Sequence, residues 1–231
     1  MNVELTDSNR LKMSRLPAYE QVLRLGRDDS TAILLDIGCC FGNDLREAVK
    51  DGFPVKNIIG SDLHPELWNL GHELFKSTPE SFPAHFVPGD AFDPSILSAT
   101  PISSEPTEAA VPDLATLKSL NPLQGHISAI HASAFFHLFD EEKQLHMARA
   151  LAGLLSPKSG SVIFGLHTGS DKKGKVSQTY MGTQLNMFCH DLKSWTALWD
   201  GQVFVKGTVN VDARLMDVAG YRLLVWSVTR V

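Results

Sequence analysis

Cysteine is scarce in this sequence of 231 residues, which has only three, two of them adjacent at Cys39 and Cys40. So few cysteines cannot build a disulfide framework, and they fit a compartment in which thiols stay reduced. Cys189 and His190 stand side by side, but neither a C-x-x-C nor an H-x-x-x-H spacing accompanies them. We therefore predict no disulfide framework and no metal site.

Long apolar runs are also missing. No stretch approaches the roughly 20 apolar residues that a membrane-spanning helix requires. The segment from Met1 to Lys12 is polar and lacks the apolar core of a secretory signal. These two absences predict a soluble, cytoplasmic protein without a membrane partner.

An excess of basic residues is the third absence. Lysine and arginine number 21 against 26 aspartate and glutamate residues, which gives a net charge of −5. Binding to nucleic-acid phosphates needs a clustered basic surface, so nucleic acid is not predicted as a partner. With 43% hydrophobic and 20% charged residues, the chain can bury a sizeable core. No pattern fixes the oligomeric state, and a homodimer is left open.

Short apolar segments alternate with amphipathic ones along the chain. Five apolar segments predict buried strands, at 32–37, 57–63, 84–87, 126–131 and 161–166. Two further β-rich segments, 203–210 and 221–229, lack a helix of crossover length between them and predict an antiparallel C-terminal hairpin. Strand alternating with helix five times predicts an α/β fold with a doubly wound, mostly parallel sheet of seven strands.

The segments between these strands predict helices and two long loops. Helices are predicted over 15–26, 43–51, 64–76, 113–120, 141–155 and 191–199. The segment 95–112 is rich in Ser, Pro, Thr and Glu and predicts an exposed loop. A second loop is predicted over 169–188.

The first predicted strand runs into an unusual turn, in the sequence LLDIGCCFGNDL. Asp36 closes the strand, and Gly38 and Gly42 let a ligand approach the backbone without meeting a Cβ atom. The pattern is not the G-x-G-x-x-G of dinucleotide-binding proteins. A carboxylate ahead of the glycines would repel a pyrophosphate but complements a sulfonium ligand that carries a free amino group.

Two more carboxylates follow at the ends of the second and third strands. Asp62, in IIGSDL, can accept hydrogen bonds from two ribose hydroxyls, and Asp90, in FVPGDAF, can accept one from an adenine amine with Ala91 or Phe92 against the ring. Each aspartate taken singly is better explained as a helix cap or turn residue. Because the carboxyl ends of parallel strands meet at one sheet edge, the three together predict a nucleoside-cofactor site.

The segment Leu34–Leu138 resembles the cofactor half of class I S-adenosylmethionine-dependent methyltransferases, with Cys40 in place of the usual middle glycine. More narrowly, DIGCCFGNDL and IHASAFFHLFDEEKQ resemble fungal O-methyltransferases of polyketide–terpenoid (meroterpenoid) biosynthesis. The resemblance implies a Rossmann-like fold, S-adenosylmethionine as cofactor, and a secondary-metabolite acceptor that is hydrophobic. The implied cofactor-binding residues are Asp36, Gly38, Cys40, Gly42, Asp62, Leu63, Asp90, Ala91, Phe92, His131 and Ala132.

The resemblance also implies one domain over 1–231. Its expected parts are an N-terminal cover helix in 1–30, a cofactor half in 31–140 and a substrate-side half in 141–231.

Methyl transfer needs a positioned nucleophile, and a carboxylate needs no base whereas a hydroxyl benefits from one. His131 and His137 follow the fourth strand and are the candidate catalytic residues, with packing as the alternative for each. His137, His167, Tyr180 and Met181 are the candidate substrate-binding residues. The last two lie in the predicted 169–188 loop, which we interpret as a lid over an apolar acceptor.

The predicted function is O-methylation of a carboxyl or hydroxyl group on a hydrophobic natural-product intermediate. The main alternative keeps the fold and the cofactor but catalyses cyclisation or isomerisation without methyl transfer. An NAD-dependent oxidoreductase is disfavoured by the missing glycine fingerprint, and a non-enzymatic binding module has no direct support in the sequence.

Overall fold

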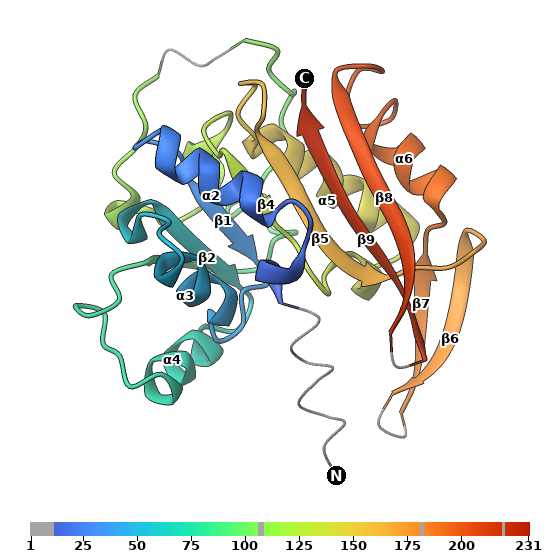
Figure 1. Cartoon of the computed structure of the whole chain (residues 1–231), viewed down its shortest axis with the longest axis horizontal. Helices are drawn as coiled ribbons and strands as arrows, with labels where there is room; N and C mark the ends of the chain where they lie inside the picture. Colours follow the sequence, from blue (N-terminus) through green and yellow to red (C-terminus); the bar gives the residue numbers. More distant parts are fainter. Residues whose placement is uncertain (1–11, 106–108, 181–182, 219) are drawn as a thin grey trace.

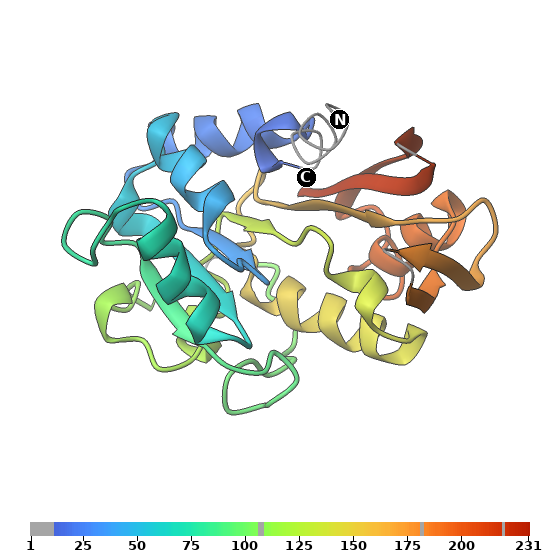
Figure 2. The same ribbon diagram turned by 90° about the horizontal axis from the view of Figure 1, so that it is seen from below.

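A computed structural model describes residues 12–105, 109–180, 183–218 and 220–231. Its main sheet has seven strands in the order β3-β2-β1-β4-β5-β9-β8, parallel from β3 to β5 and antiparallel at β9 and β8. Helices lie on both faces of this sheet (Figures 1 and 2). The predicted doubly wound sheet with an antiparallel C-terminal hairpin is confirmed.

The elements alternate as the sequence patterns predict. The parallel strands are β1 (Leu34–Ile37), β2 (Ile58–Asp62), β3 (His85–Pro88), β4 (Ala129–His131) and β5 (Val162–Thr168). The antiparallel strands are β6 (Gly174–Tyr180), β7 (Thr183–Cys189), β8 (Val209–Val218) and β9 (Tyr221–Arg230). The α-helices are α2 (Tyr19–Asp28), α3 (Asn43–Lys50), α4 (Pro65–Leu74), α5 (Glu141–Leu154) and α6 (Leu192–Trp199). Short 3₁₀ turns are η1 (Met13–Arg15), η2 (Val55–Asn57), η3 (Leu114–Thr116), η4 (Asn121–Leu123) and η5 (Phe136–Leu138).

The two faces of the sheet bury separate cores because successive strand side chains point to opposite faces. Leu35 of β1 packs in the core that includes α5 and α6, whereas its neighbour Leu34 packs in the core that includes α2 and α3. Both residues are fully buried. Burial on both faces explains why the parallel strands are almost wholly apolar.

Three predicted elements differ in the structure. The strand predicted over 203–210 is mostly wrong: residues 203–208 form a turn, and the strand begins only at Val209. Asp200 Oδ1 accepts the Gly207 N–H at 2.7 Å and closes this turn. Strand β8 forms by pairing with β9. Alternate residues of β8 face solvent and several are polar, so its sequence lacks the continuous apolar run that identifies the buried strands.

The helix predicted over 113–120 is also wrong, since only the short turns η3 and η4 form there. Asn121 holds this segment through its side chain, which accepts the Ser98 N–H at 2.8 Å and donates to the Pro94 carbonyl at 2.9 Å. These contacts with the distant 94–98 segment replace the local hydrogen bonds of a helix.

The loop predicted over 169–188 contains a β-hairpin instead. Strands β6 and β7 pair antiparallel on either side of residues 181–182, in a two-stranded sheet separate from the main one. No helix in the described ranges is both long and apolar enough to span a membrane.

An aromatic cluster fills the space between α6 and the C-terminal strands. His167 and His190 pack against Trp195 with ring-centroid distances of 4.7 and 5.4 Å, and both histidines are 2% exposed. Trp226 donates its Nε1–H to His167 Nδ1 at 3.0 Å. Burial, together with neighbouring His137 and His190, lowers the pKa of His167 well below its usual range.

Acid is expected to destabilise this cluster. Burial, with the nearby Lys173 cation, lowers the pKa of His190 to about 4, against about 6.5 in an unfolded chain. The unfolded state therefore takes up the proton first, so the contribution of His190 is complete above pH ~6.5 and is lost as the pH falls toward ~4. The expected loss is about 3 kcal/mol.

Urea unfolding of the wild type and of His190→Phe, followed over this pH window, checks the prediction. His190→Phe keeps a ring in the cluster but removes the titrating group, so its stability should fall less on acidification. An equal loss in both proteins would show that His190 does not carry the effect.

Candidate functional site

The turn after β1 has the backbone that its glycines suggest. Gly38 and Gly42 adopt φ values of +76° and +71°, in the left-handed region that glycine favours. A Cβ atom at Gly42 would lie 2.7 Å from the Trp68 ring, and one at Gly38 would lie 3.1 Å from Phe135. Gly42 is the N-cap of α3, so this turn leads directly into a helix N-terminus.

Cys40 also lies in the left-handed region, with φ at +51°. A residue with a side chain in this backbone conformation is less stable than glycine by about 1 kcal/mol. The resemblance to the family implies a glycine at this position. Burial raises the pKa of the Cys40 thiol, so this residue is not an activated nucleophile.

Asp62 is fixed at the end of β2 by two backbone donors. Its Oδ2 accepts the Cys40 N–H and its Oδ1 accepts the His64 N–H, both at 2.9 Å. The bond to Cys40 ties the second strand to the turn after the first. Leu63 beside it has a side chain that is 57% exposed, which is unusual for leucine.

The third aspartate lies in the turn after β3. Asp90 is exposed and its Oδ1 accepts the Phe92 N–H at 2.9 Å. Phe92 and Ala91 are partly buried against the α5-side core, and Phe92 contacts Phe139 edge to face at 4.8 Å between ring centroids. Asp36 and Asp62 lie in the last two residues of β1 and β2, and Asp90 follows β3, so the three aspartates lie at the carboxyl ends of neighbouring strands.

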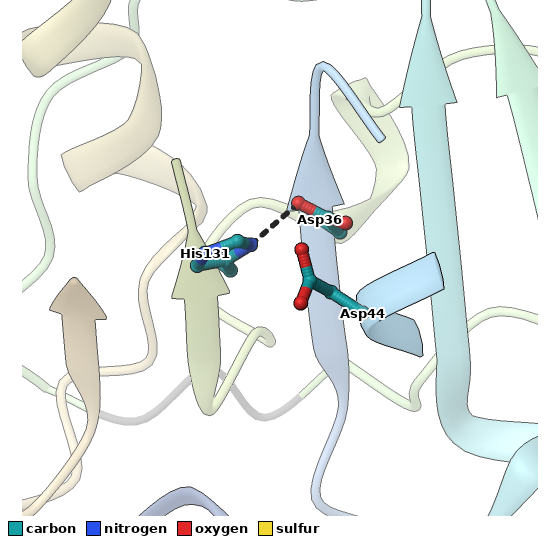
Figure 3. Close-up of side chains that lie close together, drawn as sticks. All are labelled: Asp36, Asp44 and His131. Carbon is teal, nitrogen blue, oxygen red and sulfur yellow. Dashed lines mark hydrogen bonds and ion pairs between the residues drawn. The ribbon is translucent and has the colours of Figure 1, made fainter. Parts of the chain in front are cut away.

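Asp36 and His131 form a buried ion pair between β1 and β4. His131 Nδ1 lies 2.8 Å from Asp36 Oδ1, and the two residues are 2% and 3% exposed. Figure 3 shows the pair with Asp44, from the first turn of α3, beside it. Ligand atoms of these three side chains all lie within 4.8 Å of one another.

His131 is occupied at both ring nitrogens. Its Nε2 lies 2.7 Å from Ser133 Oγ, which also accepts the Leu166 N–H at 3.2 Å. Burial alone would lower the pKa of His131, but the Asp36 carboxylate outweighs it and raises that pKa. The charged imidazolium form of the ring is therefore favoured beside Asp36.

The burial of three predicted residues argues against their direct contact with a ligand. His131 is enclosed and doubly hydrogen-bonded, so the geometry disfavours it as a catalytic base. Ala132 has no exposed surface for a cofactor, and His167 lies inside the aromatic cluster rather than on a cavity wall. Their strand-end positions are as predicted, but neighbouring strands and α6 cover them.

A cavity of about 480 Å³ lies where η5 and the start of α5 face the β6–β7 hairpin. Gln144 of α5 donates to the Phe188 carbonyl at 2.8 Å and holds the hairpin against this helix. The cavity is lined by His137, Leu138, Phe139, Asp140, Glu141, Glu142, Lys175, Asn186, Met187 and Phe188.

His137 is therefore the predicted substrate-side residue that the structure places on a cavity wall. The neighbouring prediction at Met181 lies outside the described residues, and Tyr180 is described by its backbone alone. The sequence did not point to Asp44, because an aspartate at a helix start is ordinarily explained by the helix dipole. The sequence also did not identify Phe139 as a cavity residue, because the cavity exists only where the β6–β7 hairpin lies opposite η5 and α5.

Relatives of known name support the predicted family. The chain is 33% identical over 229 residues to the Asnovolin E/Chermesin D methyltransferase nvfJ of Aspergillus novofumigatus, covering 95% of this chain and 73% of nvfJ. It is 30% identical over 198 residues to the O-methyltransferase phiE of a fungal species, covering 86% and 58%. Methyltransferase adrK of Penicillium roqueforti is 32% identical over 192 residues, covering 82% and 59%. The chain thus spans less than three fifths of the length of phiE and adrK.

Solved structures share the fold at low sequence identity. An S-adenosylmethionine-dependent methyltransferase from Methanosarcina mazei superposes with a TM-score of 0.58 at 13% identity, covering 88% of this chain and 94% of that one. The 1,6-didemethyltoxoflavin-N1-methyltransferase of Burkholderia thailandensis, bound to S-adenosylhomocysteine, gives 0.55 at 13% identity, covering 98% and 82%.

No family model matches the chain. The likeness to nvfJ nevertheless extends over nearly the whole sequence. This chain belongs to the same family of class I S-adenosylmethionine-dependent methyltransferases as nvfJ, phiE and adrK.

Proposed function

We propose that this chain binds S-adenosylmethionine and directs its methyl group to an oxygen of a hydrophobic natural-product intermediate. The observation that carries the proposal is the edge formed by the β1 turn, Asp62 and Asp90. Among the relatives, phiE is named an O-methyltransferase and nvfJ a methyltransferase of asnovolin E or chermesin D, which supports an oxygen acceptor on a similar molecule.

The residues at this edge fit the cofactor. Gly38 is exposed in the turn that leads to the N-terminus of α3, where a ligand can approach the backbone closely. Asp62 is held by two backbone N–H groups with lone pairs left over for ribose hydroxyls, beside the exposed Leu63. Asp90, Ala91 and Phe92 would contact the adenine. When bound, the cofactor supplies an electrophilic methyl group on its sulfonium.

The cavity between η5 and the hairpin is our proposed acceptor site. Leu138, Phe139, Met187 and Phe188 give it apolar walls, which suit a bulky hydrophobic body. The chain has only to hold the acceptor oxygen in line with the methyl group and keep water away.

His137 favours a carboxyl acceptor over a hydroxyl. Burial lowers the pKa of His137, so its ring is neutral at pH 7. The Thr168 N–H points at Nδ1 at 3.5 Å, so Nδ1 is the acceptor nitrogen and Nε2 carries the proton. A ring that offers an N–H can orient a carboxylate, which needs no base, but cannot take a proton at that atom.

Calorimetric titration with S-adenosylmethionine, S-adenosylhomocysteine and NAD tests the cofactor proposal. We expect both sulfur ligands to bind and NAD not to, and Asp62→Ala to weaken binding at least about tenfold, because the carboxylate–hydroxyl bonds are lost. Glu66→Ala, an exposed carboxylate in the next helix, is the matched control and should leave affinity unchanged.

Binding of NAD alone, or equal affinity in wild type and Asp62→Ala, would contradict the proposal. Formation of S-adenosylhomocysteine in the presence of an acceptor then separates methyl transfer from a cyclisation or isomerisation on the same fold.

A further inference from the structure

The β6–β7 hairpin depends on other elements for its position. Its strands form a two-stranded sheet separate from the main one. A two-stranded hairpin is at best marginally stable by itself, so contacts with the rest of the protein must hold it in place. Met187 and Phe188 of this hairpin form one wall of the acceptor cavity. That wall is therefore only as well positioned as the contacts that hold the hairpin.

Gln144 of α5 supplies such a contact from inside the protein. Its side chain is 1% exposed, and glutamine is seldom so deeply buried. Its Nε2 donates to the Phe139 carbonyl at 2.9 Å and to the Phe188 carbonyl at 2.8 Å. Because a carbonyl oxygen only accepts, these two bonds use both N–H groups of the amide. One side chain thus joins a residue on each of the two facing walls of the cavity.

A contribution to stability does not explain why glutamine is at this position. Its Oε1 is buried and has no hydrogen-bond partner in the part of the chain that the structure describes. A buried carbonyl without a donor is unfavourable, and a methionine, which is flexible and of similar length, would avoid that penalty. Methionine could not donate to two carbonyls. Gln144 is therefore better suited to joining the two walls than to filling space.

The two walls are not held equally well by their other contacts. The Phe139 ring packs against the α5-side core, with ring-centroid distances of 4.8 Å to Phe92 and 5.2 Å to Phe135. Phe188, on the hairpin, is only partly buried. If the bonds from Gln144 were lost, the wall expected to move is the one that carries Phe188.

We propose that Gln144 is a positioning residue that sets the width of the acceptor cavity and thereby selects acceptors by the size of their ring system. This assignment rests on the proposed function, since it takes this cavity as the acceptor site. Among the described residues, Gln144 is not one of those that line the cavity. It acts by fixing Phe188 opposite Phe139 and not by contact with the acceptor.

Three hydrophobic carboxylic acids probe the width of the cavity: bicyclic 1-naphthoic acid, tricyclic dehydroabietic acid and pentacyclic oleanolic acid. Each is titrated into protein saturated with S-adenosylhomocysteine. We expect the wild-type affinities to span at least about tenfold, because a cavity of fixed width fits one ring system best, and Gln144→Met to reduce the span to less than about threefold. Gln184→Met makes the same change at an exposed position of β7 and should keep the wild-type span.

Hydrogen exchange tests the same contact without an acceptor. In Gln144→Met, the amides of β6 and β7 should exchange at least about fivefold faster than in the wild type, whereas those of β1 and β4 should keep their rates. The reason is that the hairpin loses its contact with α5 and the main sheet loses nothing. Faster exchange throughout the chain would assign Gln144 to overall stability and overturn the proposal, as would unchanged exchange in the hairpin.

The remaining outcomes separate Gln144 from the function on which its role rests. Equal affinity spans in the wild type and in Gln144→Met would overturn the positioning role while leaving the acceptor site intact. Gln144→Leu repeats the test with another apolar side chain, and loss of the folded state in both variants would assign Gln144 to stability alone. A wild type that binds S-adenosylhomocysteine but none of the acids would overturn the acceptor site and the role of Gln144 with it. A wild type that does not bind S-adenosylhomocysteine would overturn the cofactor proposal.

Discussion

His131→Phe is expected to lower the free energy of unfolding by about 3–5 kcal/mol, because it leaves the Asp36 carboxylate buried without its cation. The phenylalanine ring has a similar size and can keep the contact with Phe164, whose ring centroid lies 5.2 Å from that of His131. The loss would therefore come from the charge and not from a cavity. Urea unfolding followed by tryptophan fluorescence measures it.

The matched control is the double variant Asp36→Asn/His131→Phe. With the carboxylate replaced by a neutral amide, no buried charge is left unpaired, so the double variant should recover a large part of the loss. A double variant whose loss equals the sum of the two single losses would mean that Asp36 and His131 do not interact as a pair. Their distance of 2.8 Å would then have no energetic consequence.

His137→Ala is expected to reduce kcat/KM for a carboxylic-acid acceptor roughly ten- to hundredfold. The reason is the loss of one hydrogen bond to a charged group, which is worth about 1.5–3 kcal/mol. His137→Gln keeps an N–H donor and should stay within about fivefold of the wild type. Because a carboxylate is already ionised, the rate should not fall as the pH drops through the pKa of His137, which burial lowers from the usual ~6.5.

Nitrogen–proton correlation spectra of ¹⁵N-histidine-labelled protein check the tautomer without any acceptor. We expect the proton of His137 on Nε2, as the 3.5 Å contact from Thr168 implies. A proton on Nδ1, with rate losses of about a hundredfold or more in both variants and a rate that falls as the pH drops through the lowered pKa of His137, would instead identify a general base and a hydroxyl acceptor.

The proposed cofactor edge could be predicted from the sequence because its signals are local. Asp36 near the end of the first strand, glycines that allow positive φ at Gly38 and Gly42, and an aspartate at or just after the end of each of the next two strands all lie within short segments. Parallel strands bring their carboxyl ends together whatever the side chains are, so the topology alone places these residues at one edge.

The remaining parts of the site depend on contacts between distant segments. His131 and Asp36 are 95 residues apart in the sequence. The pairing of β1 with β4 brings them into contact, and this contact argues against His131 as a catalytic base. His167 was expected at a substrate site because it lies near a strand end, but α6 and β9 enclose it among tryptophans. Strand position predicts where a residue lies along the sheet, not what covers it.

Sequence by itself therefore determined the class of fold, the family and the residues of the glycine turn, since these follow from periodicity, glycine placement and strand-end polarity. Tertiary structure decided the β6–β7 hairpin beside the proposed acceptor cavity and the burial of His131 and His167. The physical reason is that burial and ion pairing are properties of side chains from several elements at once. A carboxylate's behaviour depends on which groups lie within a few ångströms of it, and the group nearest Asp36, the His131 ring, is 95 residues away in the sequence.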